Sequence, residues 1–146
     1  MSFLNRFVVP RAAKLPARDV QVLTLAPAVM RMSIAGNDAT TELDALAVAA
    51  SKVGYPDGFS PERVFAAATE LARVIAAGGV EALTDKMKAD LSPKERADAV
   101  RLALAALFSL PTGESGDIGI LAGMAKHIGM SEAVFEALFK EAKARA

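Results

Sequence analysis

Few residue types in this chain could carry chemistry, and most of them are carboxylates. His127 is the only histidine and cysteine is absent, which excludes thiolate nucleophiles, disulfides and thiolate zinc sites. Any acid–base pair or zinc site must therefore combine His127 with Asp or Glu side chains. The sequence contains no Walker loop, dinucleotide-binding glycine fingerprint, nucleophile elbow or His-Glu-x-x-His motif. We predict no catalytic or cofactor-binding residue and expect a non-enzymatic protein.

Two further features each allow a functional and an ordinary explanation. His127 is expected near the C-terminal end of a helix, where it can bond a terminal carbonyl group or complement the helix dipole. The segment from Tyr55 to Phe59 combines two aromatic rings with Asp57, so it could contact a partner. A turn that anchors two rings explains the same residues. We favour the ordinary explanation for both.

Composition places these residues on helices packed around a substantial core. The chain has 146 residues, of which 53% are hydrophobic and only 5% aromatic, and tryptophan is absent. Ala, Leu, Val and Met supply most of the apolar content, a balance that favours closely packed helices over sheets. The length is typical of one domain. We therefore predict a single all-α domain.

Capping residues, prolines and glycines divide the chain into about seven helices. Ser92-Pro93-Lys94-Glu95 is the clearest start, because it combines a capping box with proline at the first helical position. In the first helix, Pro27 predicts a kink or an early end. The predicted helices cover 17–35, 40–53, 60 to the Gly78-Gly79 pair, 80–89, 92–110, 115–128, and a last one capped by Ser131.

An internal repeat connects the two halves of the chain. A shift of 75 residues aligns Leu46 with Leu121 and Gly54 with Gly129, and it sets Glu42 against Asp117. Both halves also share one order of elements: a charge-poor helix, a short polar loop, an amphipathic helix that stops at glycine, and a Ser-capped helix. This order is expected of a duplicated three-helix unit, although Ala-rich helices can also align by chance.

The double unit resembles the tellurite-resistance TerB-like family. The resemblance covers most of residues 18–140 and is best from Asp98 to Leu138, which includes Ala103-Leu104-Ala105-Ala106-Leu107 and Ala125-Lys126-His127-Ile128-Gly129-Met130-Ser131. It implies a bundle of two pseudo-symmetric three-helix repeats over residues 18–146, preceded by an arm at residues 1–17. It also implies a non-enzymatic interaction or stress-response module with protein partners.

The family's Asp-Gly loops have been linked to divalent metals, so the resemblance implies an alternative function, a divalent-metal-responsive domain that binds a cation weakly through loop carboxylates. The matching dipeptides in this chain are Asn37-Asp38 and Thr112-Gly113, so both loops are depleted of ligands. The remaining oxygen ligands are Asp38, Glu42, Glu114 and Asp117. A hard cation such as calcium prefers six or more oxygens. The alternative is that Asp38, Glu42 and Asp117 cap or stabilise the N-termini of helices.

Charge patterning bears on partners and location. Lys and Arg total 17, as do Asp and Glu, so no net positive charge attracts nucleic acid. The basic arm could place Phe3 and Phe7 in a membrane interface while Arg6 and Arg11 meet anionic lipid, or it could pack on the bundle. The arm lacks a continuous apolar export signal, and we expect a cytoplasmic location. The sequence leaves the oligomeric state open.

Overall fold

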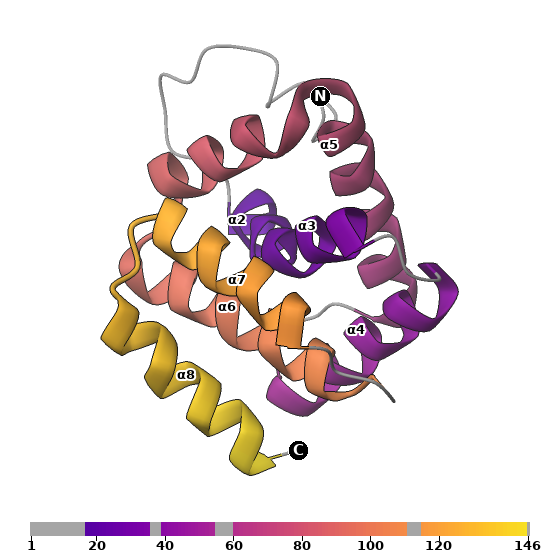
Figure 1. Ribbon diagram of the computed structural model, residues 1–146. Coiled ribbons are helices and arrows are strands. Elements are labelled where there is room, and N and C mark those ends of the chain that lie inside the picture. Colours follow the sequence, from indigo (N-terminus) through magenta and orange to yellow (C-terminus); the bar gives the residue numbers. More distant parts are fainter. Residues whose placement is uncertain (1–16, 36–38, 55–59, 111–114, 146) are drawn as a thin grey trace.

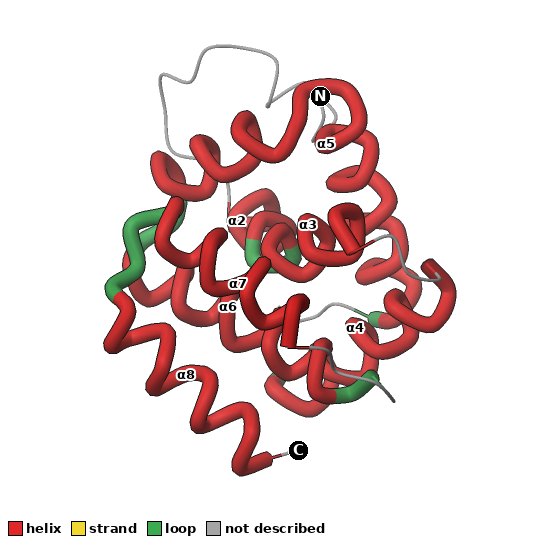
Figure 2. Tube along the Cα trace, in the orientation of Figure 1, coloured by secondary structure: helices red, strands yellow, loops and turns green. Residues whose placement is uncertain are grey.

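The structure is a computed structural model, and it describes residues 17–35, 39–54, 60–110 and 115–145. Within these ranges every regular element is a helix and no strand occurs, as Figure 2 shows. The all-α prediction is confirmed. The N-terminal arm up to residue 16, the segment from Tyr55 to Phe59, Asp38 and Glu114 lie outside the described residues.

The first predicted helix is in fact two helices, α2 (Ala17–Leu23) and α3 (Ala26–Ala35). The break does not occur at Pro27 but at the turn that contains Thr24. The Thr24 hydroxyl donates a 2.6 Å hydrogen bond to the carbonyl of Gln21, and such local bonds compete with the helical backbone pattern. Pro27 lies in the first turn of α3, where its missing N–H leaves no partner unsatisfied.

Helix α5 (Pro61–Asp90) consists of two helical segments that meet at a kink, as the prediction of two helices divided by Gly78-Gly79 requires. At Gly79 the backbone has φ 81° and ψ 171°, a conformation that is essentially restricted to glycine. The predicted end of one helix and the predicted start of the next therefore both occur at this break. As predicted, Ser60 caps the start, and its hydroxyl accepts a hydrogen bond from the backbone N–H of Arg63.

The other helices begin and end within a few residues of their predicted positions, the usual uncertainty of helix ends. They are α4 (Ala39–Val53), α6 (Pro93–Phe108), α7 (Ser115–His127) and α8 (Glu132–Arg145). Gly54 and Gly129 have φ values of 78° and 89°, as expected of glycines that end helices. The predicted capping box of Ser92 and Glu95 is present.

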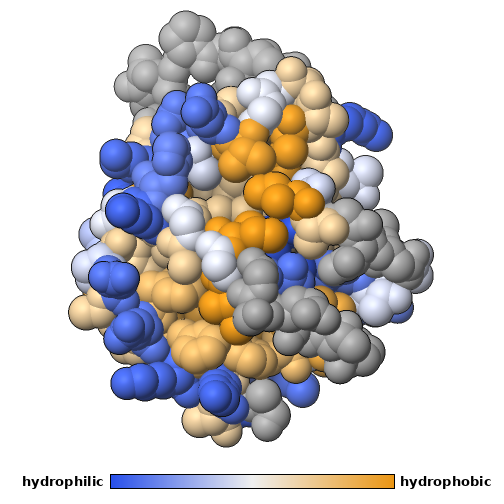
Figure 3. All heavy atoms as spheres, in the orientation of Figure 1, coloured by the Kyte–Doolittle hydropathy of each residue, from blue (hydrophilic) through white to orange (hydrophobic). Residues whose placement is uncertain are grey.

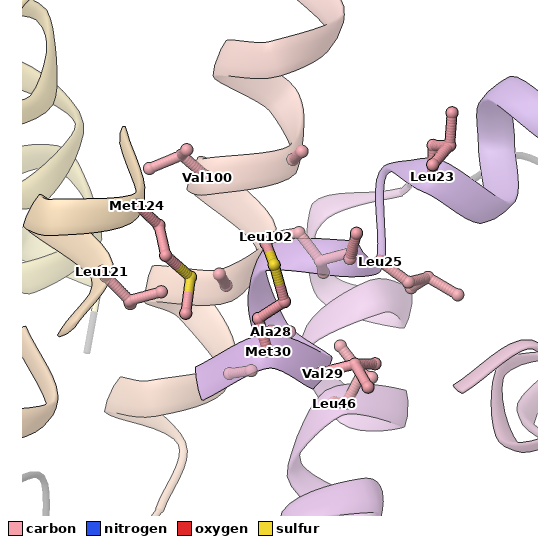
Figure 4. Packing of buried hydrophobic residues seen from close by; sticks show 14 of the residues in the cluster. Leu23, Leu25, Ala28, Val29, Met30, Leu46, Val100, Leu102, Leu121 and Met124 are labelled. Atoms are coloured by element: carbon pink, nitrogen blue, oxygen red, sulfur yellow. The ribbon is translucent and has the colours of Figure 1, made fainter. Parts of the chain in front are cut away.

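Helices α3 and α6 form the centre of the bundle. Figure 1 shows α3 surrounded by other helices, with α5 bending around it and α7 beside it, and α3 contacts α4, α5, α6 and α7. The small residues Ala26 and Ala28 are fully buried on α3. Met30 belongs to the same buried cluster as Leu102 of α6 and Leu121 and Met124 of α7, which Figure 4 shows. Met30 is fully buried and belongs to the core.

Arg96 fastens the start of α6 to the ends of two other helices. Its guanidinium donates hydrogen bonds to the carbonyls of Lys88 (3.0 Å) and Leu91 (3.1 Å) at the end of α5, and to the carbonyl of Ile128 (3.2 Å) after α7. The last carbonyls of a helix lack partners within the helix. One side chain therefore provides hydrogen-bond donors for carbonyl groups at the ends of α5 and α7, and it fixes the positions of these ends relative to α6.

The surface combines charged edges with apolar areas. Figure 3 shows hydrophilic side chains along the left edge of one face and apolar side chains near its centre. Among the described residues, the large apolar side chains that are most exposed are Ile34 (52%), Val48 (48%) and Val134 (45%). None of the described helices is both long and apolar enough to cross a membrane.

Candidate functional site

The most unusual buried group is the guanidinium of Arg31. Arg31 is the only charged residue of α3, and its exposed fraction is 1%. The residues before it, from Ala26 to Met30, are all buried, so the helix carries its one charge into the core. A charge removed from water must be compensated by opposite charges and hydrogen bonds. Arg31 therefore needs buried anionic partners on the helices that pack against α3.

Two carboxylates from different helices provide this compensation. Arg31 donates two hydrogen bonds to Glu42, from Nη1 to Oε2 at 3.0 Å and from Nη2 to Oε1 at 2.5 Å. Nη1 also lies 3.3 Å from Oδ2 of Asp117. The contact with Glu42 has the bidentate geometry that suits a planar guanidinium. We call Arg31, Glu42 and Asp117 the buried triad; it joins α3, α4 and α7.

The triad brings together two of the four predicted metal ligands. Glu42 and Asp117 lie in the first turns of α4 and α7, where a helix dipole favours negative charge. This position fits the alternative that they stabilise helix N-termini. Arg31 already supplies a positive charge between them. Asp38 and Glu114 lie outside the described residues, and among those described no three His, Asp or Glu side chains group closely enough to hold a metal. The cation site stays a prediction.

His127 is where the sequence predicts it. It is the last residue of α7, together with Lys126 in the final turn, and its side chain is exposed. This is the position at which a basic side chain complements the helix dipole.

A groove of about 400 Å³ lies between the second halves of α4 and α6 and the end of α8. We call it the α4/α6/α8 groove. Its floor is apolar and consists of Val53, Ala105, Phe108 and Ala142, which are half-buried or buried. The Phe108 ring also packs against Phe139 of α8, and the centroids of the two rings are 5.7 Å apart. Its volume is in the range of ligand-binding pockets in proteins.

The rim of this groove is polar and mainly cationic. Lys52 of α4, Arg101 of α6 and Arg145 of α8 line it, together with Glu141. Arg101 is neutralised by two carboxylates, since its Nε lies 2.6 Å from Glu141 and its Nη1 lies 2.7 Å from Asp98. Lys52 and Arg145 are exposed, and neither forms a salt bridge with another described residue. The groove therefore combines an apolar floor with two cationic side chains that form no salt bridge with any described residue.

Sequence reasoning identified the carboxylates of the triad but missed Arg31 and the groove. For Arg31 a signal exists: it is a single charge in an otherwise uncharged helical run, Ala26 to Ala35. A lone arginine in such a run predicts a buried ion pair. The groove offers no comparable signal, because its residues come from three segments far apart in the sequence.

Comparison with known proteins provides no relative. No protein-family model matches the chain, and no curated protein or solved structure matches it either.

Proposed function

We propose that this chain is a non-enzymatic interaction module, a divergent relative of the TerB-like stress-response proteins, and that it binds a protein partner in the α4/α6/α8 groove. The observation that supports this proposal is the groove itself. Its floor offers apolar surface for burial, and its rim offers charges that can select a partner.

The residue types in the groove suit protein recognition. Aromatic and arginine side chains dominate the binding energy of many interfaces when they lie in a partly enclosed site. Phe108 and Arg101 occupy such positions here, and both are held in place, by Phe139 and by Glu141 respectively. Binding to a preorganised surface costs less conformational entropy than binding to a mobile one.

The buried triad supports the TerB-like part of the proposal. The shift that aligns the two halves of the sequence sets Glu42 against Asp117, and these two side chains share one guanidinium. When two units are related by a two-fold axis, equivalent positions that lie near the axis come together, and the shared guanidinium fits such an arrangement.

Site-specific photo-crosslinking tests this function. In the cells that produce the protein, a photo-reactive amino acid replaces Val48, which lines the groove. In the control, the same amino acid replaces Val134. The two valines have similar exposed fractions, 48% and 45%, but only Val48 lines the groove. We expect a discrete crosslinked protein from Val48 that is absent from Val134. Identical patterns from both positions, or none from Val48, would reject the proposal.

A further inference from the structure

The α4/α6/α8 groove continues along α4 as a longer furrow. A second recess, which Thr41 and Asp44 line together with Leu110, shares Val48 and Ser109 with the groove. From Thr41 to Lys52 the rise of an α-helix amounts to about 16 Å, or three helical turns. Val48 lies in the middle of this furrow and is 48% exposed, so the furrow is open to solvent. An elongated, open, apolar furrow beside helices fits another helix.

The two ends of the furrow carry opposite charges. Lys52 and Arg145 lie at one end and form no salt bridge with a described residue, whereas Asp44, also exposed, lies at the other end. The charge of Arg101 between them is compensated by Asp98 and Glu141. A helix that lies in the furrow would therefore meet a positive and a negative end.

Helix dipoles do not account for the positive end. Lys52 and Arg145 lie in the last turns of α4 and α8, where a cation complements the negative end of the dipole. The dipole contributes about half a charge at each helix end, whereas each side chain contributes a full charge. The two side-chain charges therefore exceed the summed partial charges of the two helix ends, and this excess favours an anionic partner group.

We infer that the partner segment is an amphipathic helix with acidic residues over Lys52 and Arg145 and a basic residue near Asp44. This inference rests on the proposed function and specifies the partner. Apolar side chains of the partner, spaced along one helix face, lie on Ala105, Phe108 and Ala142. The charges at the two ends fix the direction in which the helix lies.

Selection from a displayed peptide library tests this assignment. The library presents amphipathic helices of about 14 residues, a length that covers the furrow, with randomised polar positions. On the wild-type protein we expect enrichment of acidic residues at one end of the helix. On the double variant Lys52→Glu/Arg145→Glu, the preference should reverse to basic residues. The acidic peptides should bind that variant at least about tenfold more weakly.

A matched variant controls for a general charge effect. Arg73→Glu/Lys126→Glu makes the same change of net charge at exposed positions that do not line the furrow, and it should retain the preference for acidic helices. No enrichment, or a preference that both double variants alter equally, overturns the inference. Sedimentation with phosphatidylglycerol vesicles that depends on Lys52 and Arg145, without enrichment of any helix, overturns it in favour of a membrane surface. A crosslink from Val48 without acidic enrichment leaves the proposed function standing and rejects only the acidic helix.

Discussion

Arg31 couples three helices through a single side chain, and its removal leaves two carboxylates buried without their cation. Glu42 and Asp117 are 2% and 8% exposed, so water cannot replace the guanidinium fully. We predict that Arg31→Ala lowers the free energy of unfolding by about 3–5 kcal/mol, the usual cost of breaking a buried ion pair from one side. Urea unfolding followed by circular dichroism measures this change.

The control for this prediction removes the whole triad. The triple variant Arg31→Met/Glu42→Leu/Asp117→Leu leaves none of its charges buried, and apolar replacement of a buried ionic cluster is often close to neutral. We expect it to be more stable than Arg31→Ala. If the triple variant is as unstable as the single one, packing volume rather than charge compensation explains the role of Arg31.

The sequence reveals only part of this cluster. Glu42 and Asp117 are identifiable because they occupy corresponding places in two similar segments. Arg31 lies 11 residues from Glu42 and 86 from Asp117, and its contacts depend on how α3 packs against α4 and α7. No local pattern encodes that packing. The lone charge in an apolar helix indicates a buried partner, but it does not identify the partner.

At the scale of elements, the kink in α5 depends on one glycine. No atom lies within 4 Å of a Cβ added to Gly79, whereas its φ of 81° is unfavourable for any residue with a side chain. We predict that Gly79→Ala destabilises the protein by about 2 kcal/mol through backbone strain alone. Thermal or urea unfolding checks this value.

The neighbouring glycine provides a matched comparison. Gly78 is helical, and a Cβ added to it would lie 3.6 Å from the Cβ of Ala82, an ordinary contact. Alanine is favoured over glycine in a helix by about 1 kcal/mol, so Gly78→Ala should stabilise the protein slightly. Equal effects of the two substitutions would contradict the assignment of the break to Gly79.

Most helix boundaries could be predicted because their causes are local. The Ser92–Glu95 capping box and the glycines at 54 and 129 act within one turn of the backbone. The break at Thr24 was missed because a threonine that bonds the preceding turn is common inside helices as well. The break at Gly79 and the new helical segment after it could likewise be predicted, because the Gly78-Gly79 pair is a local signal.

At the scale of the whole molecule, the α4/α6/α8 groove arises from the way three helices pack. In Figure 1, α6 lies between α4 and α8, and α6 contacts both of them. Val48, Ala105 and Ala142 become neighbours in the groove only through this arrangement. The sequence therefore predicts the helices but not the groove, and the groove carries the functional proposal.

A competing recess defines the most direct test of this account. It lies between α3, α4 and α5, and Met32, Leu43 and Thr69 line it. The decisive measurement is the map of backbone amide chemical shifts when the isotope-labelled protein is titrated with the partner captured through Val48. We predict shifts centred on Lys52 and Ala105 in the α4/α6/α8 groove. Shifts centred on the competing recess, with the groove unchanged, would contradict the account.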